Sequence, residues 1–344
     1  MSDVRLPEGA RTAAAGGASP ASRAAPTVSV IMPAWNAMRY IHAAIDSVLS
    51  QSYQDLELIV INDGSSDGDY AALERIDPRV RVIDGARGGV SRARNLGMAR
   101  AHGRYFAFID ADDLWVPGKL QMQVDYLEAH PDLGIVFGEI HRWRPSPDGA
   151  WPDPRAHFPD AQTLAQPNPD WHGWMYTRIL MGCTLGMITP LMRREVYQAA
   201  GGFDESMERG EDYDFWLRCS RHARIQGFSA VMAIYRIHPA SAMHKMIERN
   251  HLAELLERAR ERWGLSDPDG RQLPRLHYRY RLGRAHFDHG YTHFWSGDPA
   301  VAAREFAQSF RRGCLMHRAA AFWVLSQFKR LRRATAAPGP IERS

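Results

Sequence analysis

Cysteine is scarce in this chain, with three cysteines far apart among 344 residues. None forms a C-x-x-C pair, and an odd number cannot all be paired, which excludes a disulfide scaffold and a cysteine-ligated metal site. Unpaired thiols are typical of a reducing compartment. We therefore expect a cytoplasmic protein.

Long apolar runs are also absent. No stretch approaches the roughly 18 consecutive apolar residues that a membrane-spanning helix needs. Residues 1–26 are rich in Ala, Gly, Ser and Pro and lack the apolar core of a signal peptide. This composition favours a disordered leader.

A strong charge of one sign is missing too. The chain has 43 Lys and Arg against 39 Asp and Glu, a formal net charge of +4, which is too small to indicate a nucleic-acid binder. Hydrophobic residues make up 45% and charged residues 24%, as in ordinary globular proteins. The length suggests about two domains.

Short β-branched and apolar runs alternate with segments of helical periodicity from residue 28 onward. Strands are expected at 28–32, 56–61, 79–83, 105–109 and 135–137, and helices at 37–50, 91–102 and 119–130. This alternation predicts an α/β fold with a doubly wound, mostly parallel sheet. Beyond residue 245 the pattern is entirely helical. We therefore divide the chain into an α/β domain at 27–244 and a helical domain at 245–344.

The segment 141–180 breaks this pattern. Its many prolines predict a long irregular loop, and long loops are often functional. Trp143, Trp151, Trp171 and Trp174 lie within it. Their rings could stack on an acceptor sugar or simply cover the core, and the sequence leaves both open.

Three of the predicted strands end in polar groups. These are Pro33–Asn36, Asn62–Gly64 and Asp110–Asp113. Because ligands bind beyond the carboxyl ends of the strands in such sheets, topology brings the three groups to one rim. This convergence predicts the position of a functional site.

Carboxylates dominate that rim. Asp110, Asp112 and Asp113 follow a strand directly, and carboxylate oxygens suit Mg²⁺ or Mn²⁺, which can bridge a diphosphate. Asp63 could accept hydrogen bonds from a base or a ribose. The alternative is that both segments are ordinary Asp-rich turns.

Two later segments add candidates. Gly210–Arg218 opens a helix whose Glu211 or Asp212 could be a general base, although acidic residues also suit any helix N-terminus. His238 would be a metal ligand if it reached Asp110 and Asp112, and a structural histidine otherwise.

The motifs together resemble the family 2 glycosyltransferases, over about residues 27–240. They stand in the family's order: VSVIMPAWN (28–36), IVINDGSSD (59–67), GGVSRARN (88–95), GRYFAFIDADD (103–113), GGFDE (201–205) and GEDYDFWLR (210–218). The resemblance implies a GT-A fold, a nucleotide-sugar donor, a divalent cation and inversion at the anomeric carbon.

The resemblance also implies roles for individual residues. Pro33, Ala34, Trp35 and Asn36 would shape the pocket for base and ribose, Asp63 would contact the base, and Arg94 would lie near the nucleotide. Asp110, with Ala111 beside it, would approach the ribose. Asp112 would bind the metal, joined less securely by His238. Asp212 would be the base, with Glu211 next to it. The Q-x-x-R-W motif of processive synthases is missing, which favours a single-transfer enzyme.

We therefore expect an inverting, metal-dependent glycosyltransferase. It would move a hexose or N-acetylhexosamine from a UDP-sugar to a glycan or lipid-linked acceptor in surface polysaccharide synthesis. A nucleotidyltransferase would need a Gly-rich phosphate loop after the first strand, which Pro33–Asn36 does not supply. A non-catalytic nucleotide-sugar-binding scaffold is disfavoured because both Asp112 and Asp212 are present.

The net charge is divided unevenly along the chain. Residues 245–344 contain 19 Lys and Arg against 10 Asp and Glu, a net +9, so residues 1–244 carry −5. Arg330, Arg332 and Arg333 follow the aromatic and apolar segment Phe322–Phe328. This combination suits the surface of an anionic membrane, and we expect peripheral contact with its inner face. The alternative is a helix packed on the catalytic domain with its charges in water.

Overall fold

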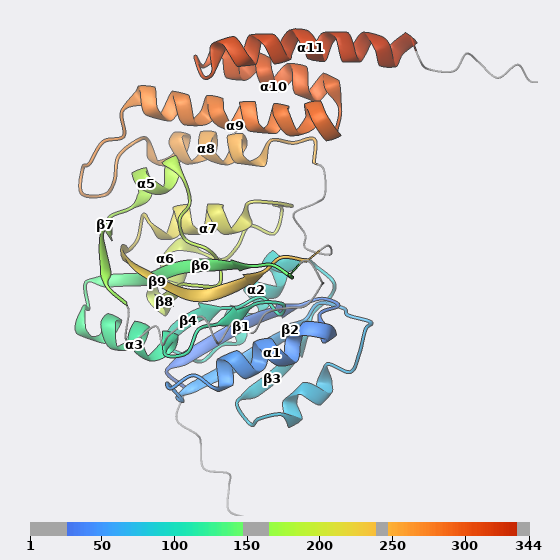
Figure 1. Ribbon diagram of the computed structural model, residues 1–344. Coiled ribbons are helices and arrows are strands. Elements are labelled where there is room, and N and C mark those ends of the chain that lie inside the picture. Colours follow the sequence, from blue (N-terminus) through green and yellow to red (C-terminus); the bar gives the residue numbers. More distant parts are fainter. Residues whose placement is uncertain (1–25, 147–164, 239–246, 336–344) are drawn as a thin grey trace, which may run out of the picture.

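The structure is a computed structural model that describes residues 26–146, 165–238 and 247–335 (Figure 1). The expected leader lies outside the described residues, except for residue 26. Trp151 and residues 239–246, next to the predicted boundary at 245, also lie outside the described residues.

A single nine-stranded sheet forms the centre of the α/β part. Its order is β3-β2-β1-β4-β8-β6-β9-β5, with β7 paired to β9 outside this path. The strands are β1 (Val28–Ala34), β2 (Leu56–Asn62), β3 (Val80–Asp84), β4 (Tyr105–Phe108), β5 (Leu114–Trp115), β6 (Leu133–Trp143), β7 (Pro167–Gly173), β8 (Leu191–Arg193) and β9 (Arg224–Arg236). Strands β3, β2, β1 and β4 are parallel, and antiparallel pairing begins at β8.

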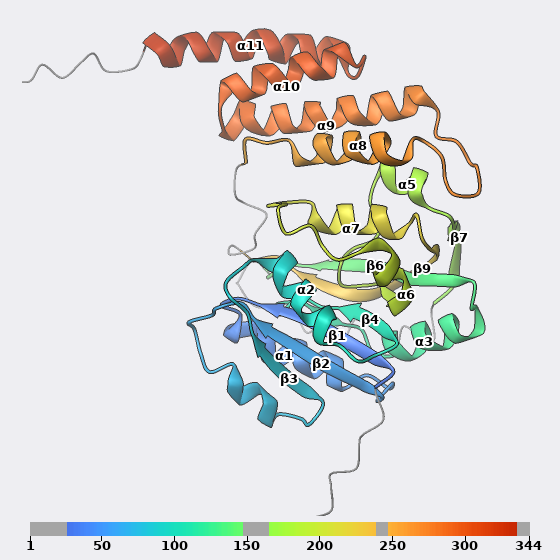
Figure 2. The same ribbon diagram turned by 180° about the vertical axis from the view of Figure 1, so that it is seen from behind.

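Helices cover both faces of this sheet (Figures 1 and 2). They are α1 (Met38–Leu49), the 3-10 helix Ala71–Arg75, α2 (Val90–Arg100), α3 (Lys119–Ala129), α5 (Tyr176–Met181), α6 (Arg194–Ala200) and α7 (Glu211–Cys219). Side chains alternate along each strand, so Val30 and Met32 face the α1 and α3 side, whereas Ile31 faces α2. The predicted doubly wound α/β fold is confirmed.

The C-terminal region is helical, as predicted. It consists of α8 (His251–Trp263), α9 (Arg275–Ser296), α10 (Pro299–Arg311) and α11 (Met316–Thr335). Figures 1 and 2 show these helices stacked beyond α7, with α11 outermost. No helix within the described residues is long and apolar enough to cross a membrane.

The prediction of an irregular segment over 141–180 is partly wrong. Strand β6 continues to Trp143, and β7 and α5 lie inside the segment. Strand β7 contains Pro167 and Pro169, which lack a backbone N–H. It tolerates them because it is an edge strand, paired on one side with β9 alone.

Candidate functional site

The turns after β1 and β2 form one unit at the rim of the sheet. The Asn36 amide donates to Ser65 Oγ at 3.0 Å, and the Ser66 amide donates to Asn36 Oδ1 at 2.9 Å. These bonds hold Asn36 in the left-handed region, at φ 49°. Two of the three predicted strand ends therefore meet at this rim.

The four residues expected around the base and ribose divide into two pairs. Pro33 and Ala34 are buried inside β1, where the Ala34 carbonyl accepts the Asp63 amide at 2.8 Å. Trp35 and Asn36 are exposed beyond the strand. The Trp35 side chain is 56% exposed, and the Arg87 guanidinium lies 5.9 Å from its ring centroid. An open ring beside a cation offers a stacking surface at the rim.

Asp63 is buried, and both of its carboxylate oxygens are engaged. They accept the amides of Gly88 and Gly89, each at 2.8 Å. Gly89 has φ 86°, a conformation suited to glycine, and the first turn of α2 follows directly. In this structure Asp63 therefore fastens the loop that leads into α2.

Arg94 joins the two acidic segments of the site. Its side chain is 4% exposed and donates to Asp110 Oδ1 at 2.9 Å and to Glu211 Oε1 at 3.2 Å. Burial acts to lower the pKa of Arg94, but the two carboxylates outweigh it and raise the pKa. A permanently charged guanidinium thus connects the end of β4 to the start of α7.

A second cluster lies where β4 and β9 end. His238 Nε2 is 2.8 Å from Asp112 Oδ2, while the buried Asp113 accepts the Arg236 amide at 2.8 Å. Burial, followed by the charge of Asp110, raises the pKa of Asp112 and raises that of Asp113 further. Burial is thus the main cause in both cases, and neighbouring carboxylates add to it.

The Asp112–His238 pair fits part of a cation site. Two ligands on adjacent corners of an octahedron lie about 3 Å apart when each is about 2.1 Å from the ion, close to the separation seen here. A carboxylate oxygen and an imidazole nitrogen suit Mn²⁺. Among the described residues, no group of three or more His, Cys, Asp or Glu side chains is arranged to hold a metal.

Asp212 lies in the first turn of α7, after Gly210 in the left-handed conformation at φ 79°. Glu211 is held by Arg94, and burial raises its pKa. Asp212 is half-buried, and its Oδ1 accepts the following amide at 2.7 Å. Burial, with Asp212 nearby, raises the pKa of Cys183 to about 12, so this thiol stays protonated.

A cleft of about 1230 Å³ is lined by Arg94 and by the acidic residues on either side of it, whereas Asp112 and His238 are not part of its lining. Asp110, Glu211 and Asp212 line it, and so do Asp288, His289, Thr292 and His293 of α9. Trp171 and Gly186 also line it, whereas Trp143 is buried under the Arg236 guanidinium, 4.3 Å away. One tryptophan therefore faces the cleft and another covers the core.

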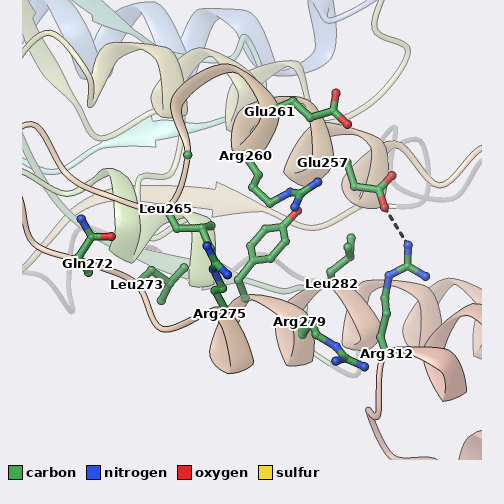
Figure 3. Close-up of a pocket in the computed structure, with 12 residues that line it drawn as sticks. Glu257, Arg260, Glu261, Leu265, Gln272, Leu273, Arg275, Arg279, Leu282 and Arg312 are labelled. Atoms are coloured by element: carbon green, nitrogen blue, oxygen red, sulfur yellow. Dashed lines mark hydrogen bonds and ion pairs between the residues drawn. The ribbon is translucent and has the colours of Figure 1, made fainter.

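A second cavity, of about 850 Å³, lies in the helical region and includes none of the predicted site residues. Figure 3 shows its lining of arginines and glutamates from α8, α9 and the turn after α10, with Arg312 Nη2 paired to Glu257 Oε1 at 2.8 Å. Of the two cavities, the larger cleft is therefore the one lined by Asp110, Glu211 and Asp212.

Residues 29–181 match the model of Glycosyl transferase family 2. The chain carries a family 2 glycosyltransferase domain. This glycosyltransferase resembles several curated proteins. It is 29% identical over 255 residues to an uncharacterized glycosyltransferase of Haemophilus influenzae, covering 68% of this chain and 72% of the relative. It is 28% identical over 257 residues to TuaG of Bacillus subtilis, which is named as a putative glycosyltransferase of teichuronic acid biosynthesis. This match covers 74% of this chain and 90% of TuaG.

Solved structures share the GT-A fold of this glycosyltransferase. S. aureus TarS 1–349 in complex with UDP-GlcNAc superimposes with a TM-score of 0.61 at 17% identity, covering 87% of this chain and 89% of that one. The mannosyltransferase PcManGT from Pyrobaculum calidifontis, in complex with GDP-Man and Mn²⁺, superimposes with a TM-score of 0.52 at 20% identity. This match covers 89% of this chain and 80% of PcManGT.

Two features of this glycosyltransferase escaped the sequence analysis. Arg236 donates through Nε to the Asp112 carbonyl at 2.8 Å and packs on Tyr40 and Trp143, so it fixes the carboxylate turn. Helix α9 lines the cleft, although its residues lie beyond the family motifs. The Tyr-Arg-Ile-His run before Pro239 could have indicated the role of Arg236. No motif in the sequence indicated that α9 lines the cleft.

Proposed function

We propose that this glycosyltransferase moves a hexose or N-acetylhexosamine from a UDP-sugar to a glycan or lipid-linked acceptor, with inversion at the anomeric carbon. The observation that carries the proposal is the cleft in which the carboxylate turn after β4 and the acidic start of α7 lie together, joined by Arg94. A single displacement needs the base and the leaving group on opposite faces of the reacting carbon. These two segments are separate in sequence and can serve opposite faces.

We assign Asp212 as the general base. A sugar hydroxyl is a poor nucleophile, so its proton must be accepted as the attack proceeds. Glu211 is occupied by Arg94, whereas Asp212 lines the cleft with a single short hydrogen bond among the described residues. Glu211 then acts as a positioning residue that holds the first turn of α7 against Arg94.

Asp112 and His238 would hold Mn²⁺ or Mg²⁺. When bound, the cation supplies positive charge that stabilises the leaving diphosphate. The 2.8 Å spacing of Asp112 Oδ2 and His238 Nε2 supports this assignment. The Mn²⁺ in the related mannosyltransferase structure supports a divalent cation as well.

The nucleotide would lie along the rim outside the cleft. Trp35 and Asn36 offer exposed groups there, and Asp63, with Pro33 and Ala34 behind it, would complete the base pocket. Arg94, Asp110 and Ala111 would border the ribose and the diphosphate. The UDP-GlcNAc complex of TarS supports a uridine nucleotide.

The acceptor would enter between Trp171 and α9. The aromatic ring offers a flat face to a sugar, and the name of TuaG, which refers to teichuronic acid biosynthesis, supports a surface polysaccharide as product. A lipid-linked acceptor would make contact between the enzyme and a membrane surface useful.

The test uses three variants and a matched control. Asp212→Asn should reduce transfer about 10²- to 10⁴-fold, the usual range for loss of a general base, and leave UDP-sugar binding unchanged. Asp112→Ala should also weaken Mn²⁺-dependent UDP-sugar binding. Glu211→Gln should lower activity together with melting temperature, and the exposed Glu208→Gln should change neither.

The readouts are UDP release across a panel of nucleotide sugars, thermal shift with and without Mn²⁺, and the anomeric configuration of the product by NMR. Wild-type turnover of Asp212→Asn would refute the base assignment. A product with retained configuration would refute the single displacement.

A further inference from the structure

Helix α11 presents large apolar side chains to the outside of the molecule. Val324 is 44% exposed, Leu325 48% and Phe328 60%, and Trp323 beside them is 42% exposed. Solvent-exposed apolar residues are common singly, but a continuous group of this size on one helix indicates an interaction surface.

The exposed group forms one face of α11. Ala321, Val324 and Phe328 follow one another at spacings of three and four residues, which places them on one side of the helix. The opposite side carries Ala319 and Phe322, which pack with Phe306 and other rings of α9 and α10. The inward face is therefore satisfied by packing, and the outward face is a second apolar stripe.

Positive charge accompanies this outward face. The sequence of α11 contains five Lys and Arg and no Asp or Glu. Lys329 lies toward α9, with Nζ donating to the Phe294 carbonyl at 2.7 Å, and Arg318 lies over the Phe287 ring. These two cations therefore lie toward the inner helices, whereas Arg330 and Arg332 are exposed. Exposed basic side chains next to an apolar face, with a tryptophan at its border, match the requirements of an interfacial membrane helix.

We propose that the outward face of α11 docks on the surface of an anionic lipid bilayer. The apolar side chains would enter the boundary between headgroups and acyl chains, and the flanking cations would pair with lipid phosphates. Figures 1 and 2 show α11 as the outermost layer, so this face can meet a flat surface without a clash from the catalytic sheet.

A second copy of the chain fits this face less well. A symmetric dimer through this face would bring the exposed Arg330 and Arg332 of one helix toward those of the other, with no carboxylate on α11 to neutralise them. An anionic bilayer supplies the opposite charge. Charge complementarity therefore favours the lipid surface as the partner of this face.

The experiment measures flotation of the full chain with vesicles of phosphatidylcholine, alone or mixed with phosphatidylglycerol. The test variant is Phe328→Glu. The matched control is Leu276→Glu, because Leu276 is an equally apolar side chain, 76% exposed, in the first turn of α9 and away from α11. Both substitutions lie outside the proposed catalytic machinery, so UDP release and melting temperature should stay at wild-type values and report that the fold is intact.

We expect the wild type and Leu276→Glu to float with the mixed vesicles and Phe328→Glu to bind at least tenfold more weakly. Binding should fall with added salt and without phosphatidylglycerol. Equal flotation of Phe328→Glu and wild type would overturn the proposal. So would light scattering that shows a dimer broken by Phe328→Glu, together with no flotation of the wild type.

Discussion

Arg94→Met removes the cation that holds the two acidic segments of the cleft together. Methionine keeps much of the apolar volume, so the main change is the loss of the guanidinium. Breaking a buried ion pair by removing one partner costs about 3–5 kcal/mol of folding free energy. The Asp110 and Glu211 side chains are 29% and 16% exposed and can partly rehydrate, which places the expected loss near the lower end, about 3 kcal/mol.

This loss is measurable as a shift in melting temperature. At about 2 °C per kcal/mol for a large domain, Arg94→Met should unfold roughly 6 °C below the wild type. The control is Arg92→Met, two residues earlier on α2, where the side chain is exposed. It should melt within about 1 °C of the wild type, because exposed charges contribute little.

A double-mutant cycle isolates the contact with Glu211. Glu211→Gln should destabilise the Arg94→Met protein less than it destabilises the wild type, with a coupling of about 1–3 kcal/mol. Chemical denaturation of the four proteins gives the required free energies of unfolding. Additive effects, or equal melting temperatures for Arg94→Met and Arg92→Met, would refute the view that Arg94 joins the two segments.

Three further predictions concern other parts of the fold. Burial acts to raise the pKa of Glu57, but four hydrogen bonds, from Ser29, Arg81 and the amide and ring of His102, outweigh it and lower the pKa below its usual value. Glu57→Gln should therefore lose about 1.5–3 kcal/mol of folding free energy at pH 7, a difference that disappears as the pH falls below the folded pKa. Asp63→Ala should raise amide exchange at Gly88 at least tenfold, because the carboxylate accepts that amide at 2.8 Å; unchanged protection would contradict this. A methyl group on Gly103 would lie 2.5 Å from a backbone nitrogen of β1, so Gly103→Ala should lower the melting temperature by an amount equivalent to about 1–3 kcal/mol, whereas Gly182→Ala, with open space around it, should not.

The sequence predicted the parallel half of the sheet well because each of its strands is a short apolar run that ends in polar turn residues. Val28–Ala34 and Leu56–Asn62 begin where the pattern places them, and the polar ends meet at one rim. Their position follows from local composition and from the rule that parallel strands share a carboxyl edge.

The antiparallel half was harder to predict because its elements depend on tertiary pairing. Strand β8 has three residues and β5 two, too few for a periodic signal. Strand β7 contains prolines that a local reading takes as breakers, and only its position at the edge of the sheet accommodates them. The roles of side chains have the same limit. The sequence offered Asp63 as an acceptor for a base or a ribose, or as a turn residue, whereas in the structure it accepts the amides of Gly88 and Gly89.

The net charge of the chain changes near residue 245, but the hydrophobic core continues across that point. Leu255 and Leu256 of α8 belong to the same core cluster as Phe215 and Trp216 of α7. Buried hydrogen bonds also cross this point, since the Thr177 hydroxyl and amide donate to Asp267 at 2.7 and 2.8 Å.

The first two C-terminal helices thus complete the core of the catalytic part. Because α8 and α9 are fixed against α7 in this way, α9 is held as a stable wall of the cleft near Asp212. The outer helix α11 has no part in that wall and is left with an apolar face outward. Packing therefore assigns two roles to the helical region: the inner helices shape the site in which transfer is proposed, and the outer helix provides the surface proposed to meet the lipid.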